Sequence, residues 1–167
     1  MILRIAKILL AASAGVLGLL TGVDNIVDYP TNLEVVRHVM SMDTTHAHDA
    51  LMGRAIYSDA LHRLFYWGII ATEIVYGGLC LIGALRLFGA RASSAASFDE
   101  AKDIALAGLA LGFGLYFFGF MIIGGEWFQM WQSEDWNLQE AAFRFIGCIG
   151  VVLIFVALPE AERGGSE

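Results

Sequence analysis

The chain has 167 residues, of which 57% are hydrophobic and 16% charged, and its formal net charge is −7 at pH 7. The mean hydropathy of +0.65 excludes an ordinary soluble domain, in which roughly a quarter of the residues are charged. The negative charge argues against nucleic acid as a partner, and without a glycine-rich phosphate loop nothing supports an NTPase of the Walker type.

Four apolar stretches are each long enough to cross a bilayer, which takes about 20 residues. They predict transmembrane helices over residues 5–23, 62–88, 104–125 and 140–158. The predicted fold class is therefore all-α, a four-transmembrane-helix bundle that forms a single integral membrane domain over residues 1–167.

The first stretch imitates a secretory signal, because "MILRIAKILLAASAG" has a basic start, an apolar run and small residues. The apolar run continues to Val23, however, beyond the usual length of such a signal. We interpret it as a retained first helix.

The loop over residues 24–61 is long and partly apolar. Thr31 and Glu34 have the spacing of a capping box, in which each side chain satisfies a backbone donor of the other. Leu33, Val36 and Met40 follow at helical spacing. We predict a short amphipathic helix that lies on the membrane or caps the bundle, and a second short helix around residues 47–55.

All four histidines lie in this loop or at its edge, close to two methionines. Imidazole and thioether together can hold copper, and imidazoles alone can hold zinc. No residue pattern that would orient such ligands is evident, so we predict no metal and no cofactor. The weak candidates for a metal site are His46, His48, His62, Met40 and Met42.

Basic residues in short loops predict the orientation in the membrane. Arg4 and Lys7 lie at the N-terminus, Arg163 lies in the tail 159–167, and the loop 126–139 has no Lys or Arg. The loop 89–103 and its flanks carry three more: Arg86, Arg91 and Lys102. We predict a multi-pass protein of the bacterial inner membrane, with both termini and loop 89–103 in the cytoplasm and loops 24–61 and 126–139 outside.

Small residues recur along the spans and predict close helix packing, as membrane helices require. They are Ala14, Gly18, Gly22, Gly77, Gly78, Gly108, Gly112, Gly119, Ala141, Gly147 and Cys148. Both cysteines, Cys80 and Cys148, fall inside spans, where a thiol is usually a packing residue. Disulfide chemistry is therefore not expected.

Tryptophan and tyrosine favour the membrane–water boundary. The residues predicted to form an interfacial aromatic belt at the outer boundary are Tyr66, Trp67, Trp127, Trp131 and Trp136.

Charged residues inside spans are costly and need an explanation. Glu73 lies near mid-membrane, Glu126 at the outer end of the third span, and Arg144 one to two turns into the fourth, four residues after Glu140. We expect Arg144 to reach Glu126 and Glu73. The cluster then either clamps the bundle or forms a polar pocket open to the outside. No catalytic residues can be identified.

The chain resembles the DUF2165 family of predicted small integral membrane proteins. The most specific part is "GGEWFQMWQSEDWNLQEAAFRFIGCIGVVLIFVALP", and "DN" at Asp24, "HVMSMDTT" at His38, "RAI" at Arg54 and "WGIIATE" at Trp67 are similar too. The family-like positions are Asp43, Arg54, Glu73, Glu126, Trp127, Trp131, Gln132, Trp136, Asn137 and Arg144. The chain departs at "HAHDA", residues 46–50, where a Phe-Pro-like segment is usual, which weakens the metal hypothesis. The resemblance implies a four-helix bacterial membrane protein and no particular reaction.

The leading functional hypothesis is a non-enzymatic accessory or scaffold subunit of a membrane complex. The alternative is a binder or carrier of a lipid, quinone or small amphiphile that uses a pocket near Glu73, Glu126 and Arg144. An enzyme acting at the outer leaflet comes third. The expected partners are the lipid bilayer, a larger membrane complex or a second copy of the chain, and a lipid or quinone, but no nucleic acid.

Overall fold

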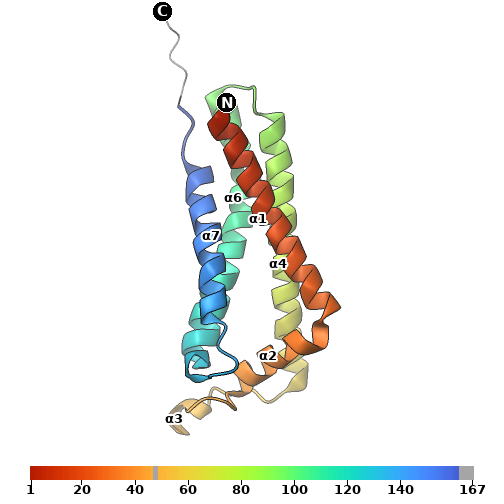
Figure 1. Cartoon of the computed structure of the whole chain (residues 1–167), viewed down its shortest axis with the longest axis vertical. Coiled ribbons are helices and arrows are strands. Elements are labelled where there is room, and N and C mark those ends of the chain that lie inside the picture. Colours follow the sequence, from red (N-terminus) through yellow and green to blue (C-terminus); the bar gives the residue numbers. More distant parts are fainter. Residues whose placement is uncertain (47–48, 162–167) are drawn as a thin grey trace, which may run out of the picture.

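The computed structural model describes residues 1–46 and 49–161. Four long helical segments run side by side along the long axis of the molecule (Figure 1). Over the described ranges the chain is helical without strands, so the predicted all-α four-helix bundle is confirmed. The elements are α1 (Ile2–Val27), α2 (Tyr29–Ser41), α3 (Asp49–Met52), α4 (Asp59–Gly89), α5 (Ala95–Glu100), α6 (Asp103–Gly114), the π-helix η1 (Leu115–Trp127), the 3-10 helix η2 (Met130–Gln132) and α7 (Gln139–Ala157).

Four helical segments are long and apolar enough to cross a membrane, and each overlaps one predicted span. They are Ile2–Val27, Asp59–Gly89, Ala95–Trp127 and Gln139–Ala157. The third comprises α5, α6 and η1, and the hydrogen bonds of η1 reach five residues back instead of four.

The first three spans pack closely through small residues, as predicted. A Cβ added to Gly77 in α4 would lie 2.7 Å from the Leu19 nitrogen and 2.9 Å from the Gly15 oxygen of α1. A Cβ added to Gly108 in α6 would lie 2.8 Å from the Cys80 nitrogen of α4. Side chains at these positions would push the helix backbones apart, so glycine sets the helix separation.

The small-residue prediction is wrong for α7. Gly147 has nothing within 4 Å of an added Cβ, and Cys148 is exposed. This helix packs through Ala142, Ile146 and Ile149 instead, which belong to the central core cluster. The apolar side chains of α7 therefore decide which of its faces is inward.

One end of the bundle, here called the loop end, is closed by α2, α3 and η2 (Figure 1). The predicted short helix is α2, and its Leu33 packs against Tyr66 and Ile70 of α4. The predicted capping box is wrong. The helix already begins at Tyr29, after Asp28 and without a side-chain cap.

The opposite end, here called the basic end, is formed by residues 1–7, 90–102 and 158–161. Figure 1 shows the N-terminus there, beside the connection between α4 and α6. Ser94 caps α5 by accepting from the Ser97 backbone N–H.

Candidate functional site

A buried carboxylate lies where α1, α4 and η1 meet. Glu73 of α4 is 3% exposed. Its Oε2 accepts from Asn25 Nδ2 of α1 at 2.7 Å, and its Oε1 accepts from Tyr116 Oη of η1 at 3.3 Å. Among the residues that the structure describes, no ion pair involves Glu73. Neutral donors alone therefore compensate this carboxyl group.

The donor Asn25 is itself held in place. Tyr66 Oη donates to the Asn25 backbone oxygen at 2.8 Å and lies 3.3 Å from Asn25 Oδ1. Tyr66 is 2% exposed, so its predicted place in an interfacial belt is wrong. Its aromatic ring packs inward and its hydroxyl orients the amide that binds Glu73.

Tyrosine side chains continue the polar site into the core. Tyr116 stacks on Phe145 of α7 with ring centroids 4.5 Å apart. Tyr76 meets Tyr116 edge-on at 6.5 Å. The Tyr76 hydroxyl is buried and has no hydrogen-bond partner among the described residues. Because buried polar atoms are nearly always paired, this unpaired hydroxyl is an exception within the core of the bundle.

A cavity of about 240 Å³ opens beside Glu73 at the loop end. No lysine or arginine belongs to its lining, whereas two carboxylates do, those of Asp24 and Glu73. The site is consequently rich in hydrogen-bond acceptors and negative charge. Its polar lining consists of Thr21, Asp24, Asn25, Asn32, Glu73 and Tyr116, and its apolar lining of Phe120, Leu138, Ala141, Ala142 and Phe145.

A second cavity of about 630 Å³ lies between α2, α4 and η1, and all its lining residues are apolar. Phe120 and Leu138 line both cavities, so the polar and the apolar cavity are neighbours. The apolar lining comprises Val35, Val36, Val39, Met40, Ile56, Phe65, Ile69, Leu115, Phe118, Gly119, Phe120, Ile123, Gly124, Trp127, Phe128, Met130 and Leu138.

The predicted cluster of Glu73, Glu126 and Arg144 does not form. Arg144 pairs with Glu140 at 3.0 Å, and the two side chains are 73% and 85% exposed. The Glu126 side chain is exposed as well. The expectation assumed regular α-helical winding up to Glu126, whereas the wider π-helical winding of η1 turns this residue away from the bundle.

The aromatic residues at the loop end divide into two groups. Trp67, Trp127 and Trp131 are about half exposed, at 50%, 50% and 52%, and their place at the membrane boundary stays a prediction. Trp136 instead stacks on His38, with centroids 4.4 Å apart.

Arg54 joins the aromatic group at the loop end. Its guanidinium lies 4.7 Å from the Trp127 ring centroid and donates to the Trp127 backbone oxygen at 3.3 Å. The structure thus brings together two positions that the family resemblance had marked.

The residues considered for a metal site are dispersed. Met40 and Met42 are buried with Phe128 in an apolar cluster. His62 Nε2 lies 2.7 Å from the Ile56 oxygen, and the His46 backbone N–H donates to Gln132 Oε1 at 2.8 Å. His48 lies outside the described residues. Within residues 1–46 and 49–161, no three His, Cys, Asp or Glu side chains gather as metal ligands would.

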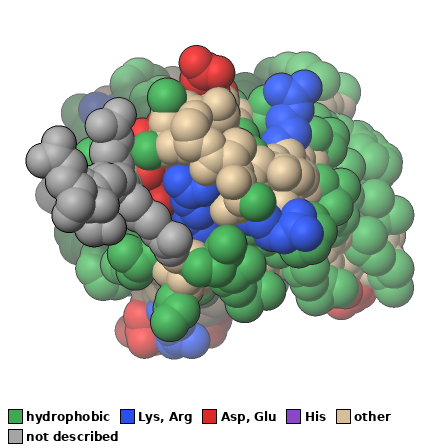
Figure 2. All heavy atoms as spheres, turned by 90° about the horizontal axis from the view of Figure 1, so that it is seen from above, with side chains coloured by type: hydrophobic (Ala, Val, Ile, Leu, Met, Phe, Trp, Pro, Cys, Tyr) green, Lys and Arg blue, Asp and Glu red, His purple; other side chains and the backbone are tan. Residues whose placement is uncertain are grey.

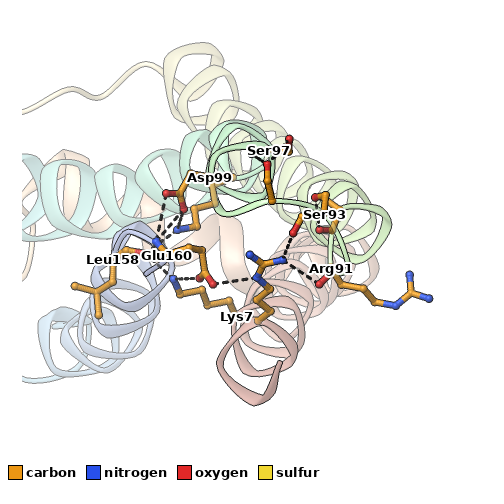
Figure 3. A network of polar contacts seen from close by, with 11 residues as sticks. Lys7, Arg91, Ser93, Ser97, Asp99, Leu158 and Glu160 are labelled. Atoms are coloured by element: carbon orange, nitrogen blue, oxygen red, sulfur yellow. Dashed lines mark hydrogen bonds and ion pairs between the residues drawn. The ribbon is translucent and has the colours of Figure 1, made fainter. Parts of the chain in front are cut away.

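A buried ionic network at the basic end was missed by sequence reasoning (Figure 3). Lys7 Nζ donates to Glu160 Oε1 at 2.7 Å and to the Leu158 oxygen at 2.5 Å. Lys102 Nζ donates to the same oxygen at 2.6 Å and to Asp99 Oδ1 at 2.5 Å. The network fastens the residues after α7 to α1 and α6. One signal was present in the sequence, a lysine inside the first predicted span.

Arg4 completes this network. Its Nε donates to Glu160 Oε2 at 3.0 Å, so both carboxylate oxygens of Glu160 are bound by cations. Burial alone would raise the pKa of Glu160, but the Lys7 ammonium and the Arg4 guanidinium outweigh it and hold that pKa below its usual value. Such full compensation is typical of a structural ion cluster.

A family model described as "Predicted small integral membrane protein (DUF2165)" matches residues 3–159 of the chain. Comparison with curated proteins finds no match, and comparison with solved structures finds none either.

Proposed function

The chain belongs to the DUF2165 family of predicted small integral membrane proteins, and from this premise we propose that it binds an amphiphile with a neutral or cationic headgroup. It is a multi-pass membrane protein, so its apolar surface contacts the lipid bilayer. The observation that carries the proposal is that two neighbouring cavities, one acidic and one apolar, share Phe120 and Leu138 in their linings.

The apolar cavity suits the tail of such a ligand. A volume of about 630 Å³ falls within the roughly 300–1,000 Å³ of small-molecule sites, which are mostly apolar with a few polar groups. An alkyl or isoprenoid chain would fill it without leaving a polar atom unpaired.

The polar cavity selects the headgroup. The carboxyl groups of Asp24 and Glu73 repel a phosphate or sulfate, because no cation lines the cavity to compensate them. A hydroxyl or ammonium group would instead donate to Glu73, which lines the cavity. The headgroup class is therefore a hydrogen-bond donor, such as an amine, an alcohol or a reduced quinone.

The role we propose is non-enzymatic. The groups around the polar cavity include one buried carboxyl, tyrosines and amides, and no nucleophile paired with a base stands out among them. Binding and release account for the geometry without a bond-breaking step.

We place the basic end in the cytoplasm of a bacterial inner membrane, by the positive-inside rule. Four of the basic residues that the structure describes lie at that end, and Arg86 lies next to it in the last turn of α4; the four are Arg4, Lys7, Arg91 and Lys102. The two cavities then open toward the outside. A C-terminal alkaline phosphatase fusion, active only outside the cytoplasm, should be inactive, and an active fusion would reverse the orientation.

Binding of matched ten-carbon amphiphiles tests the proposed function. Native mass spectrometry of the detergent-solubilised protein should show binding of decylammonium and decanol and little binding of decyl phosphate. Equal binding of decyl phosphate would refute the headgroup assignment.

Two glycine substitutions test the tail site. Gly119 lines the apolar cavity and an added Cβ there meets only a leucine methyl at 3.8 Å, so Gly119→Leu should fill the cavity and abolish binding of decylammonium and decanol. Gly114→Leu is the control, because Gly114 has open space around it and does not line the cavity. Unchanged binding by Gly119→Leu would exclude this cavity.

The accessory-subunit hypothesis is the second candidate. The observation that favours it is the outer face of α7, where Gly147 and Cys148 leave a backbone notch uncovered. Purification in nanodiscs should recover a stoichiometric partner that Gly147→Leu removes. Repeated recovery of the chain alone would count against this role.

A further inference from the structure

A third cavity, of about 920 Å³, lies at the basic end, far from the amphiphile site. It is lined by residues 1–4 and 91–95 together with Glu160 and Ala161. Figure 2 shows this end of the molecule, where Lys and Arg side chains gather among apolar and neutral groups. We propose that this cavity binds the phosphate group of an anionic phospholipid.

Positive charge exceeds negative charge around the cavity. Arg4, Arg91 and Glu160 are the charged side chains of its lining. In the ionic network beside it, Arg4, Lys7 and Lys102 meet two carboxylates, those of Asp99 and Glu160. The carboxylate of Glu160, although it lines the cavity, already accepts from two cations. Each cation has a carboxylate partner, but three cations share two carboxylates, so the network carries a net formal charge of +1.

Arg91 adds a further cation at the rim of the cavity. Its guanidinium lies 4.0 Å from the Phe88 ring centroid and donates to the Phe88 oxygen at 2.7 Å. Within the described part of the chain it pairs with no carboxylate. Figure 3 shows its side chain pointing away from the buried network, so Arg91 can bind an external anion without disturbing Lys7 or Glu160.

The same cavity has apolar walls, which favour a lipid over free phosphate. Ile2 and Leu3 line it and are 85% and 64% exposed. At the end of a membrane-spanning helix such side chains contact acyl chains, while arginine reaches the headgroup layer. Basic pockets between helices on the cytoplasmic side are typical binding sites for anionic headgroups.

Lipid titration of the full chain tests this site, with phosphatidylglycerol and phosphatidylcholine as probes in native mass spectrometry. Phosphatidylglycerol should bind more tightly, and Arg91→Gln should weaken its binding about fivefold while phosphatidylcholine binding stays unchanged. Arg91→Lys should retain most of the binding.

Arg86→Gln is the matched control. It removes the same charge next to the same end, but Arg86 is exposed and does not line the cavity, so phosphatidylglycerol binding should persist. Equal losses in Arg91→Gln and Arg86→Gln would show nonspecific attraction and overturn the proposal. If inorganic phosphate, which has no acyl chain, displaced phosphatidylglycerol, the lipid assignment would be overturned and the cavity would be a site for a soluble anion.

Discussion

The bundle buries ionisable groups at two places, and the groups that surround them differ. Lys7 at the basic end and Glu73 toward the loop end are each 3% exposed. Lys7 meets a carboxylate and a backbone carbonyl, whereas Glu73 meets an amide and a phenol. The two groups are equally buried, but Lys7 has an ionic partner, whereas Glu73 has none among the described residues.

The surroundings of the two groups explain this contrast. Lys7 and Glu160 join α1 to the chain after α7, and removing Glu160 would leave the buried Lys7 ammonium without a carboxylate. Glu73 borders a cavity that an external donor can enter. A compensated buried charge stabilises the fold, whereas an uncompensated one beside a cavity is the binding group of the function that we propose.

Replacing Lys7 should give the largest effect. Lys7→Met leaves Glu160 with Arg4 as its remaining cation, and losing one partner of a buried pair costs at most about 3–5 kcal/mol in the free energy of unfolding. Unfolding by sodium dodecyl sulfate in mixed micelles would measure it. A loss below about 1 kcal/mol, the size expected for a surface pair, would mean that the network is not structural.

Acid should weaken the same network by a smaller amount, since a protonated Glu160 can still accept a hydrogen bond. The pKa of Glu160 lies below its ordinary value of 4.5 in the folded protein. Its contribution to stability is therefore complete above pH 4.5 and is lost as the pH falls through the lowered pKa. Thermal unfolding across this range should show the loss, and Glu160→Gln should remove this component of the pH dependence. The same pH dependence of unfolding in Glu160→Gln as in the parent protein would contradict this role of Glu160.

The other region is tested by Glu73→Gln, which keeps the side-chain shape and removes the charge. Decylammonium should bind about tenfold more weakly, since a hydrogen bond to a charged acceptor is stronger by roughly 1.4 kcal/mol than a neutral one. Decanol should bind nearly as before, and this difference separates loss of charge from misfolding. Unchanged binding of decylammonium would mean that Glu73 does not contact the headgroup.

Most of the fold was predictable, because a bilayer imposes length and hydropathy on every span. The predicted stretches 5–23 and 62–88 lie inside α1 and α4, and only helix ends were misplaced. The capping box failed because Pro30 and packing of α2 on α4 begin that helix before Thr31. Local hydrogen-bonding patterns are weaker than burial in setting such boundaries.

The site was predictable only in part. Glu73 was recognised as costly inside a span, but its partners Asn25 and Tyr116 belong to other helices and are neutral, and sequence spacing cannot pair them. The π-helical winding of η1 has no strong sequence signature and redirected Glu126. Charge alone guided the prediction toward Arg144, whereas cavity shape and neutral donors determine the site.

The smallest effect is expected for Arg144, and it bears directly on the contrast between buried and exposed charge. Arg144→Gln breaks only an exposed pair with Glu140, and pairs of this kind on a helix surface contribute about 0.3–0.5 kcal/mol. The variant should unfold in mixed micelles almost as the parent does and should bind decylammonium equally well. A loss as large as that of Lys7→Met would place Arg144 against acidic groups inside the bundle, and the site would then have to be rebuilt around an ion pair between helices. A loss of stability near zero would show that, in this bundle, the position of a charged residue within a span does not predict its contribution to stability until the burial of its side chain is known.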